Sequence, residues 1–232
     1  MVYGRLSWLL HALIPERCAL CLQPADAPVC GACRAELPWN RIACPLCALP
    51  QQTAPAHLCA ACAEEAPPFD AGWSAFRYAR PIDKAVLHLK YHAGFRSARW
   101  LGQEMAQMLA RRETPLPDLL LPVPLHPRRL RRRGYNQALE LARSIGRHLE
   151  LEVDARCARR LRATADQIGQ SAAQRRRNVR NAFAVDAARV RGRHLALIDD
   201  VMTTGSTVAE LARACREAGA ARIEVWTAAR AE

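Results

Sequence analysis

Apolar and polar positions alternate along the last two thirds of the chain with the periods of strands and helices. Short apolar runs bounded by turn residues predict strands over residues 72–78, 119–124, 195–198 and 223–227. Apolar residues at helical spacing predict helices that begin near Pro81 and that cover residues 97–112, 136–149 and 207–218. Because strands and helices alternate, we expect an α/β fold, a parallel sheet flanked by helices with ligands at the carboxyl ends of its strands.

The first third of the chain is organised around cysteines. Eight of the ten cysteines form four C-x-x-C pairs: Cys18/Cys21, Cys30/Cys33, Cys44/Cys47 and Cys59/Cys62. This spacing is typical of tight turns that each supply two thiolates to a tetrahedral zinc ion. The pairs therefore predict a small zinc-ribbon domain with two structural zinc sites. Spacing leaves open whether consecutive pairs share a zinc ion or whether the first pair shares one with the third.

The N-terminal segment decides between zinc and disulfide chemistry. A secreted disulfide scaffold would need an export signal, but the apolar stretch in residues 1–14 is interrupted by His11 and lacks a small-residue cleavage site. It predicts a short amphipathic helix, and no stretch approaches the ~20 apolar residues that span a bilayer. We expect a cytoplasmic protein that divides at a Pro-rich stretch into residues 1–66, the helix and double zinc ribbon, and residues 67–232, the α/β domain.

The motif LALIDDVMTTGST, over residues 195–207, carries the clearest chemistry. Asp199 and Asp200 follow the predicted strand, and their carboxylates suit two ribose hydroxyls or Mg²⁺. The hydroxyls and backbone N–H groups of the next residues suit a phosphate at a helix N-terminus. These residues are Thr203, Thr204, Gly205, Ser206 and Thr207. A helix N-cap at Ser206 or Thr207 would explain the hydroxyls alone, but not the two adjacent carboxylates.

This motif resembles the phosphoribosyl-pyrophosphate (PRPP) signature of the type I phosphoribosyltransferases, in which four apolar residues precede an acidic pair and a TTGST-like loop. The resemblance implies that residues 67–232 form a phosphoribosyltransferase-like domain. It also implies that Asp199, Asp200 and residues 203–207 bind PRPP together with Mg²⁺.

Positive charge is concentrated in one part of the chain. Residues 122–195 contain 18 Arg against 6 Asp or Glu, whereas the rest of the chain is neutral on balance. The densest clusters are Arg128, Arg129, Arg131, Arg132 and Arg133, then Arg175, Arg176, Arg177 and Arg180. Such residues neutralise a pyrophosphate, follow a nucleic-acid backbone, or form an ordinary solvated surface. Nine clustered arginines exceed what one pyrophosphate needs, so single-stranded DNA is a candidate partner, with Tyr91, Tyr135 and Phe183 as candidates for base stacking.

Together these features are similar to the ComF/GntX family, competence-associated proteins with an N-terminal double zinc ribbon and a phosphoribosyltransferase-like domain. The resemblance rests on PVPLHPRRLRRRGYNQA over residues 122–138, on LKYHAG over residues 89–94, and on the spaced residues Thr164, Gln167, Ser171, Arg175, Asn178 and Phe183. It implies a pyrophosphate loop made of Val123, Pro124, Leu125 and His126. It also implies that a segment of about residues 160–180 forms a lid over the site. The residues expected to contact a nucleic acid or to act with this lid are Arg128, Arg129, Arg131, Arg132, Arg133, Tyr135, Gln167, Arg175, Arg177 and Asn178.

Two functions follow from this resemblance. One is a PRPP-binding protein that acts in natural competence or DNA uptake by binding single-stranded DNA, in contact with competence or DNA-processing proteins. The alternative is an active phosphoribosyltransferase, in which a nitrogenous base displaces pyrophosphate from C1 of PRPP. No segment indicates a particular base, so the sequence leaves the acceptor and the enzymatic activity open.

Overall fold

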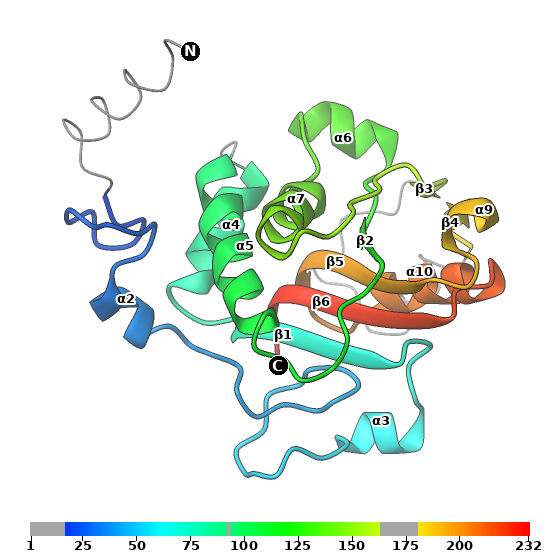
Figure 1. Cartoon of the computed structure of the whole chain (residues 1–232), viewed down its shortest axis with the longest axis horizontal. Helices are drawn as coiled ribbons and strands as arrows, with labels where there is room; N and C mark the ends of the chain where they lie inside the picture. Colours follow the sequence, from blue (N-terminus) through cyan, green and yellow to red (C-terminus); the bar gives the residue numbers. More distant parts are fainter. Residues whose placement is uncertain (1–16, 92–93, 163–180) are drawn as a thin grey trace.

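Four parallel strands form the central sheet of the protein (Figure 1). The computed structural model describes residues 17–91, 94–162 and 181–232, so the helix predicted for residues 1–14 lies outside it. The strands are β1 (Ala71–Arg77), β2 (Leu119–Pro122), β5 (His194–Met202) and β6 (Arg222–Arg230), in the spatial order β1-β6-β5-β2. All three strand pairings are parallel. The predicted parallel sheet is confirmed.

Helices cover both faces of this sheet because successive side chains of an inner strand point to opposite sides. On β5, Ala196 and Ile198 pack with α4 (Ile82–Tyr91), α5 (Phe95–Leu109) and α7 (Gln137–Leu149). Leu195 and Leu197 pack on the other face with α10 (Ser206–Glu217). These four strand residues are fully buried. The predicted fold class, a parallel sheet flanked by helices together with a small N-terminal zinc-ribbon domain, is therefore confirmed.

Several elements depart from the predicted pattern. β5 continues to Met202, so the acidic pair lies within the strand and not after it, because its hydrogen bonding to β6 continues past Ile198. The structure adds α6 (Pro127–Arg133), the antiparallel pair β3 (Ala158–Arg160) and β4 (Phe183–Val185), and the short helices α2 (Gly31–Ala35), α3 (Ala60–Glu64) and α9 (Ala187–Val190). None of the described helices is long and apolar enough to cross a membrane.

The cysteine-rich segment lies along the edge of the sheet. Trp39 forms an isolated antiparallel bridge with Phe76 of β1, and the two rings pack with centroids 4.7 Å apart. The backbone N–H of Gly72 donates to the carbonyl of Pro45 at 3.0 Å. The segment thus covers the backbone of an edge strand that would otherwise face solvent. The domain boundary at residues 66 and 67 stays a prediction.

Candidate functional site

A pocket of about 400 Å³ lies at the carboxyl ends of β2 and β5. Its lining includes Asp199, Asp200 and residues 203–207, together with Val123 and Leu125 from the segment after β2. Two residues of α6, Arg129 and Arg133, line it as well. The tertiary structure thus brings the acidic pair, the hydroxyl-rich loop and part of the basic segment to one cavity.

The acidic pair is held by a lysine from a distant helix. Lys90, in the last turn of α4, places its Nζ 3.1 Å from Oδ2 of the buried Asp200. Burial, and then the negative charge of Asp200, raise the pKa of Asp199 to about 7. Burial alone would lower the pKa of Lys90, but the two carboxylates raise it. The pair therefore stores repulsion that a cation or a hydroxyl donor would relieve.

We name residues 202–207 the phosphate loop, after the ligand that the sequence predicts for this segment. Gly205 is in the left-handed region (φ +72°) and occupies the N-cap position of α10, where no side chain caps the helix. The hydroxyls of Ser206 and Thr207 therefore do not serve as the N-cap. Thr204 Oγ1 lies 3.1 Å from Ser206 Oγ. Because the first N–H groups of an α-helix have no partner within it, the loop and helix end present donors to the pocket.

The segment after β2 is fixed by the helices that follow it. Val123 continues the sheet by donating its N–H to the carbonyl of Ile198 at 2.9 Å. Asn136, the N-cap of α7, donates its side-chain amide to the carbonyl of Val123 at 3.0 Å. His126 caps α6 by accepting from the N–H of Arg128. Of the four residues of the predicted pyrophosphate loop, Val123 and Leu125 line the pocket, while Pro124 and His126 lie beside it, partly buried.

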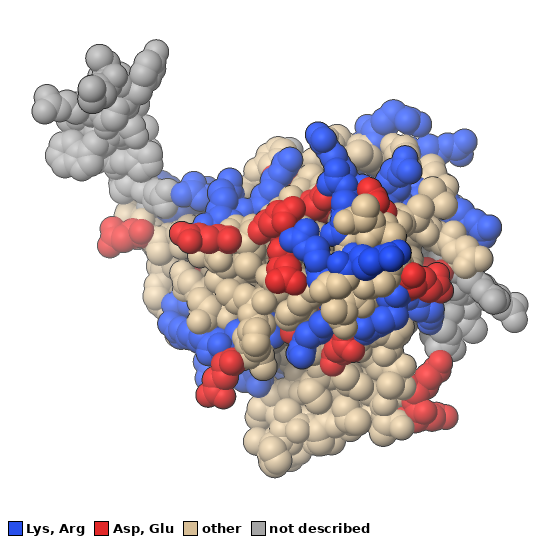
Figure 2. Space-filling view, turned by 45° about the vertical axis from the view of Figure 1, so that its right-hand side comes forward, with Lys and Arg blue, Asp and Glu red and all other residues tan. Residues whose placement is uncertain are grey.

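The helix α6 divides its five arginines between two directions. Arg129 and Arg133 are four residues apart, share one face, and line the pocket, where Arg133 donates to Gln137 Oε1 at 2.6 Å. Arg128, Arg131 and Arg132 are exposed. Figure 2 shows Lys and Arg side chains over much of the upper part of the molecule. The second zinc ribbon differs, because its residues 42–63 contain no Lys, Arg, Asp or Glu.

The three aromatic candidates for base stacking differ in their surroundings. Phe183 is buried, and the guanidinium carbon of Arg160 lies over its ring, 5.4 Å from the ring centroid. Tyr135 donates its hydroxyl to the carbonyl of Leu89 and packs against Phe95, with ring centroids 5.2 Å apart. Tyr91 is 64% exposed at the pocket, with Arg133 over its ring. Of the three, Tyr91 is thus the ring most open to a base.

Some predicted residues lie outside the described ranges: Gln167, Arg175, Arg177 and Asn178, with most of the implied lid. Three polar lining residues, in contrast, were not assigned to the site from the sequence: Tyr78, Lys90 and Arg160. Lys90, like the lining residue Gln137, belongs to a segment quoted above for the family resemblance, and that segment is the signal that could have found it. Arg160 ends β3, a strand whose existence the sequence pattern did not indicate.

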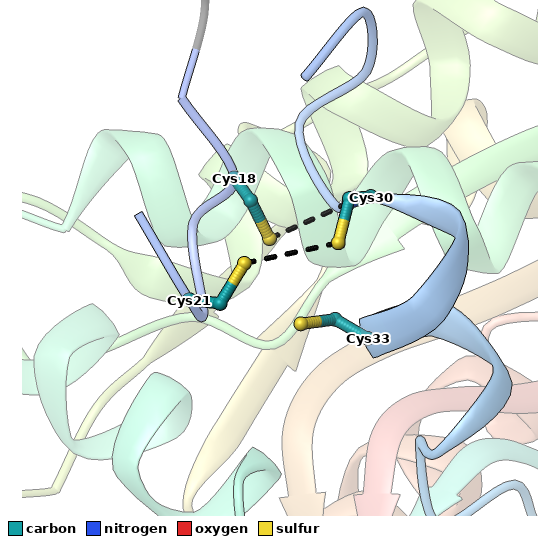
Figure 3. A group of neighbouring side chains, drawn as sticks. All are labelled: Cys18, Cys21, Cys30 and Cys33. Atoms are coloured by element: carbon teal, nitrogen blue, oxygen red, sulfur yellow. Dashed lines mark hydrogen bonds between the residues drawn. The ribbon is translucent and has the colours of Figure 1, made fainter. Parts of the chain in front are cut away.

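Each zinc site is formed by two consecutive C-x-x-C pairs. The sulfur atoms of Cys18, Cys21, Cys30 and Cys33 lie within 4.8 Å of one another, and Figure 3 shows the four side chains pointing toward a common centre. The sulfur atoms of Cys44, Cys47, Cys59 and Cys62 converge in the same way. The first pair is therefore joined to the second and the third to the fourth, and the cross-braced alternative is excluded.

In each site, backbone N–H groups favour the thiolate, the form that binds zinc, at one of the four cysteines. The N–H groups of Leu20 and Cys30 each donate to Cys18 Sγ at 3.4 Å, and that of Cys59 donates to Cys44 Sγ at 3.4 Å. Burial raises the pKa of both thiols, but backbone N–H donors, which also include Cys21 and Cys47, lower the pKa of Cys18 to about 6 and that of Cys44 to about 7. Four converging sulfurs, one of which accepts from backbone N–H groups, fit a closed structural zinc site. The remaining cysteines, Cys157 and Cys215, are buried.

Known proteins are similar to this chain, both in the zinc-ribbon segment and over most of its length. The family model for the double zinc ribbon domain matches residues 9–63. The chain is 37% identical over 220 residues to the DNA utilization protein YhgH of Escherichia coli O157:H7, covering 92% of this chain and 96% of the relative. It is 33% identical over 233 residues to Competence protein F of Haemophilus influenzae, covering 96% of this chain and 93% of the relative.

A solved structure has a more distant likeness. It is glutamine phosphoribosylpyrophosphate amidotransferase from B. subtilis, complexed with ADP and GMP. The match has a TM-score of 0.41 and 18% identity, and it covers 61% of this chain and 30% of that one.

Proposed function

Because this chain belongs to the ComF/GntX family, we propose that it acts in natural competence or DNA use by binding a ribose phosphate and single-stranded DNA at two adjacent sites. The pocket would take PRPP or a related ribose phosphate. The exposed arginines of α6, Arg128, Arg131 and Arg132, would take the DNA backbone. The relatives named for DNA utilization and competence support the biological setting.

The observation that carries this proposal is the division of α6. Arg129 and Arg133, on its pocket face, line the same cavity as the acidic pair and the phosphate loop. These three groups correspond to the three chemical parts of PRPP, its pyrophosphate, its ribose and its 5′-phosphate. Carboxylates accept from ribose hydroxyls, the loop donates to a phosphate, and guanidinium groups neutralise a pyrophosphate. Carboxylate oxygens also suit Mg²⁺. Asp199 and Asp200 would hold this ion together with the ligand, and the ion would offset the negative charge of the ligand.

The solvent face of the same helix supports the second site. A single strand binds through backbone phosphates and through bases stacked on exposed rings. Arg128, Arg131 and Arg132 provide the charge, and Tyr91 provides an exposed ring beside the pocket. Because the three arginines do not line the cavity, a strand whose phosphates bind them leaves the interior of the ribose-phosphate pocket available to its own ligand.

Two matched variants separate the sites. In the full-length protein, Arg128→Gln/Arg131→Gln/Arg132→Gln removes the solvent-facing charges, and Arg129→Gln/Arg133→Gln removes the pocket-facing ones. We expect the triple variant to weaken binding of a fluorescent oligothymidine at least tenfold and to reduce the salt slope of log K by up to about 2, since each phosphate contact on a single strand contributes ~0.7. Its affinity for Mg·PRPP, measured by calorimetry, should stay within threefold of wild type.

The pocket variant and Asp199→Asn/Asp200→Asn should show the opposite pattern, losing Mg·PRPP at least tenfold and retaining DNA binding. An absence of DNA binding by the wild type at low salt would overturn the DNA part of the proposal. Equal loss of both ligands in both arginine variants would show one shared site in place of two.

The pocket also favours an active phosphoribosyltransferase as a second function. Its volume of about 400 Å³ is in the range of small-molecule sites, and Tyr78 and Tyr91 give it aromatic walls against which an acceptor base would stack. In this reaction a ring nitrogen forms the bond to C1 of PRPP as the bond to pyrophosphate breaks. Incubation with Mg·PRPP and a panel of purines and pyrimidines should release pyrophosphate with one base only. Release no faster than without protein would exclude turnover with the panel.

A further inference from the structure

A buried arginine connects the second zinc ribbon to the phosphate loop. Arg230, at the end of β6, is 8% exposed. Its Nε donates to the carbonyl of Cys47 at 2.9 Å. Its Nη1 donates to the carbonyls of Met202 and Thr203, at 3.1 and 2.5 Å. One side chain therefore holds the backbone of a zinc-ligating cysteine and the backbone that opens the phosphate loop.

The contacts of Arg230 are to backbone carbonyls. Within the described residues, no carboxylate forms an ion pair with it; Nη1 also donates to the carbonyl of Ala231. A buried cation that loses a hydrogen-bond acceptor is left with an uncompensated desolvation cost. Displacement of the Cys47 carbonyl would thus weaken the hold of Arg230 on the loop.

The position of the Cys47 carbonyl depends on the zinc site. Cys47 Sγ lies 3.6 Å from Cys59 Sγ within the four-sulfur cluster, so metal binding fixes the peptide that carries this carbonyl. The ribbon is also seated directly on the sheet: a Cβ added to Gly72 of β1 would lie 2.3 Å from the carbonyl oxygen of Leu46. The second ribbon, β1 and Arg230 therefore form one packed unit.

The first zinc site provides an internal comparison. Its C-terminal flank contacts α5 instead, where Arg34 Nε pairs with Glu104 at 2.7 Å and Arg34 Nη2 donates to Gln107 at 2.5 Å. These contacts do not involve the phosphate loop. The two zinc sites thus have the same ligand set but different neighbours.

We propose that Arg230 is a positioning residue that couples zinc binding at Cys44, Cys47, Cys59 and Cys62 to the geometry of the phosphate loop, so that phosphate-ligand binding requires zinc at the second site but not at the first. The ligand part rests on the proposed function, because it assumes that the loop holds a ribose phosphate. The coupling itself is a property of the fold and is measured without a ligand.

The test compares four variants of the full-length protein: Cys59→Ser for the second site, Cys33→Ser for the first, and Arg230→Met and Arg230→Lys with all eight ligands present. Zinc content is measured by mass spectrometry, loop opening by hydrogen–deuterium exchange of a peptide covering residues 200–208, and affinity for Mg·PRPP by calorimetry. We expect Cys59→Ser and Arg230→Met each to speed loop exchange at least tenfold and to weaken PRPP binding at least tenfold. Cys33→Ser should leave both within threefold of wild type.

Two further results distinguish coupling from general damage. Arg230→Lys, which keeps a cationic donor, should recover part of the affinity that Arg230→Met loses while both retain two zinc ions. Combining Cys59→Ser with Arg230→Met should cost no more than either change alone, because both break one connection. If Cys59→Ser does not fold, the Arg230 variants still decide the role of Arg230.

Wild-type loop exchange in both Arg230 variants, or equal effects of Cys33→Ser and Cys59→Ser, would overturn the proposal. A wild-type protein that binds no PRPP, but whose loop exchange still responds to Cys59→Ser and Arg230→Met, would refute the ribose-phosphate function and leave the coupling intact.

Discussion

The change Asp199→Asn should stabilise the protein while it impairs the pocket. Asp199 lies beside Asp200 in the floor of the cavity, where burial and the neighbouring carboxylate raise its pKa from 3.8 to about 7. The folded state therefore binds the proton of Asp199 more tightly than the unfolded state does. Stability falls as pH rises from about 4 to about 7, because over this range the unfolded chain ionises first.

The structure sets the magnitude of this effect. At 1.36 kcal/mol per pKa unit, a rise from 3.8 to about 7 corresponds to about 4 kcal/mol at pH above 7. Because the positive charge of Lys90 already offsets part of the repulsion at Asp199, removal of the Asp199 charge recovers only part of this energy, and we expect a gain of about 2 kcal/mol at pH 8.5. At pH 5.5 the gain should be about half as large, since the folded state then still holds the proton.

The assay is urea denaturation at pH 5.5 and pH 8.5 with zinc in excess. Asp200→Asn is the matched control: it deprives Lys90 of its 3.1 Å partner, so it should give no comparable gain. The same Asp199→Asn protein should bind Mg·PRPP at least tenfold more weakly, the trade-off typical of a strained functional site. A free energy of unfolding unchanged at pH 8.5, or raised equally at both pH values, would refute the reasoning.

Three other predictions concern the scaffold. Glu224→Gln should lower the free energy of unfolding by about 3 kcal/mol in urea denaturation, because the buried carboxylate accepts from Arg112 at 2.7 and 2.9 Å and its loss leaves that guanidinium without a charge partner; a loss under 1 kcal/mol would contradict this. Gly72→Ala should lower the free energy of unfolding by at least about 2 kcal/mol, since the new methyl group meets the carbonyl of Leu46. The control Gly31→Ala, whose new methyl group has nothing within 4 Å, should lower it by less than about 0.5 kcal/mol, and equal melting temperatures of the two variants would contradict the packing of the ribbon on β1. Zinc analysis should give two ions per chain, and strong chelation should lower the melting temperature by more than 10 °C; one ion per chain would contradict the two clusters.

The length of β5 shows where sequence patterns stop being informative. The apolar run predicts a strand over residues 195–198, but β5 extends to Met202, because Asp199, Val201 and Met202 continue to pair with β6. Backbone hydrogen bonding to a neighbouring strand does not depend on apolar side chains. The chemistry of the acidic pair was predictable from its residue types, whereas its place within the strand was not.

The helix α6 was missed for a related reason. PRRLRRR has one apolar residue and therefore no apolar period. The usable signals were at its ends, where His126 and Pro127 begin the helix and Gly134, with φ +84°, ends it. Once the helix exists, the four-residue spacing of Arg129 and Arg133 places both at the pocket. The arginine cluster was visible in the sequence, but its division was not.

The sequence by itself determined which cysteines form the zinc ribbons and where the positive charge lies, and it supplied the residues that we propose for a ribose phosphate. These depend on residue type and on local spacing, which a chain carries without folding. Only the tertiary structure decided the pairing of the cysteines, the contact of Lys90 with Asp200, and the connection that Arg230 makes from a zinc ribbon to the phosphate loop. Arg230 and Cys47 are distant in the chain, and their contact arises only because the ribbon packs on the edge of the sheet, an arrangement that no local pattern encodes.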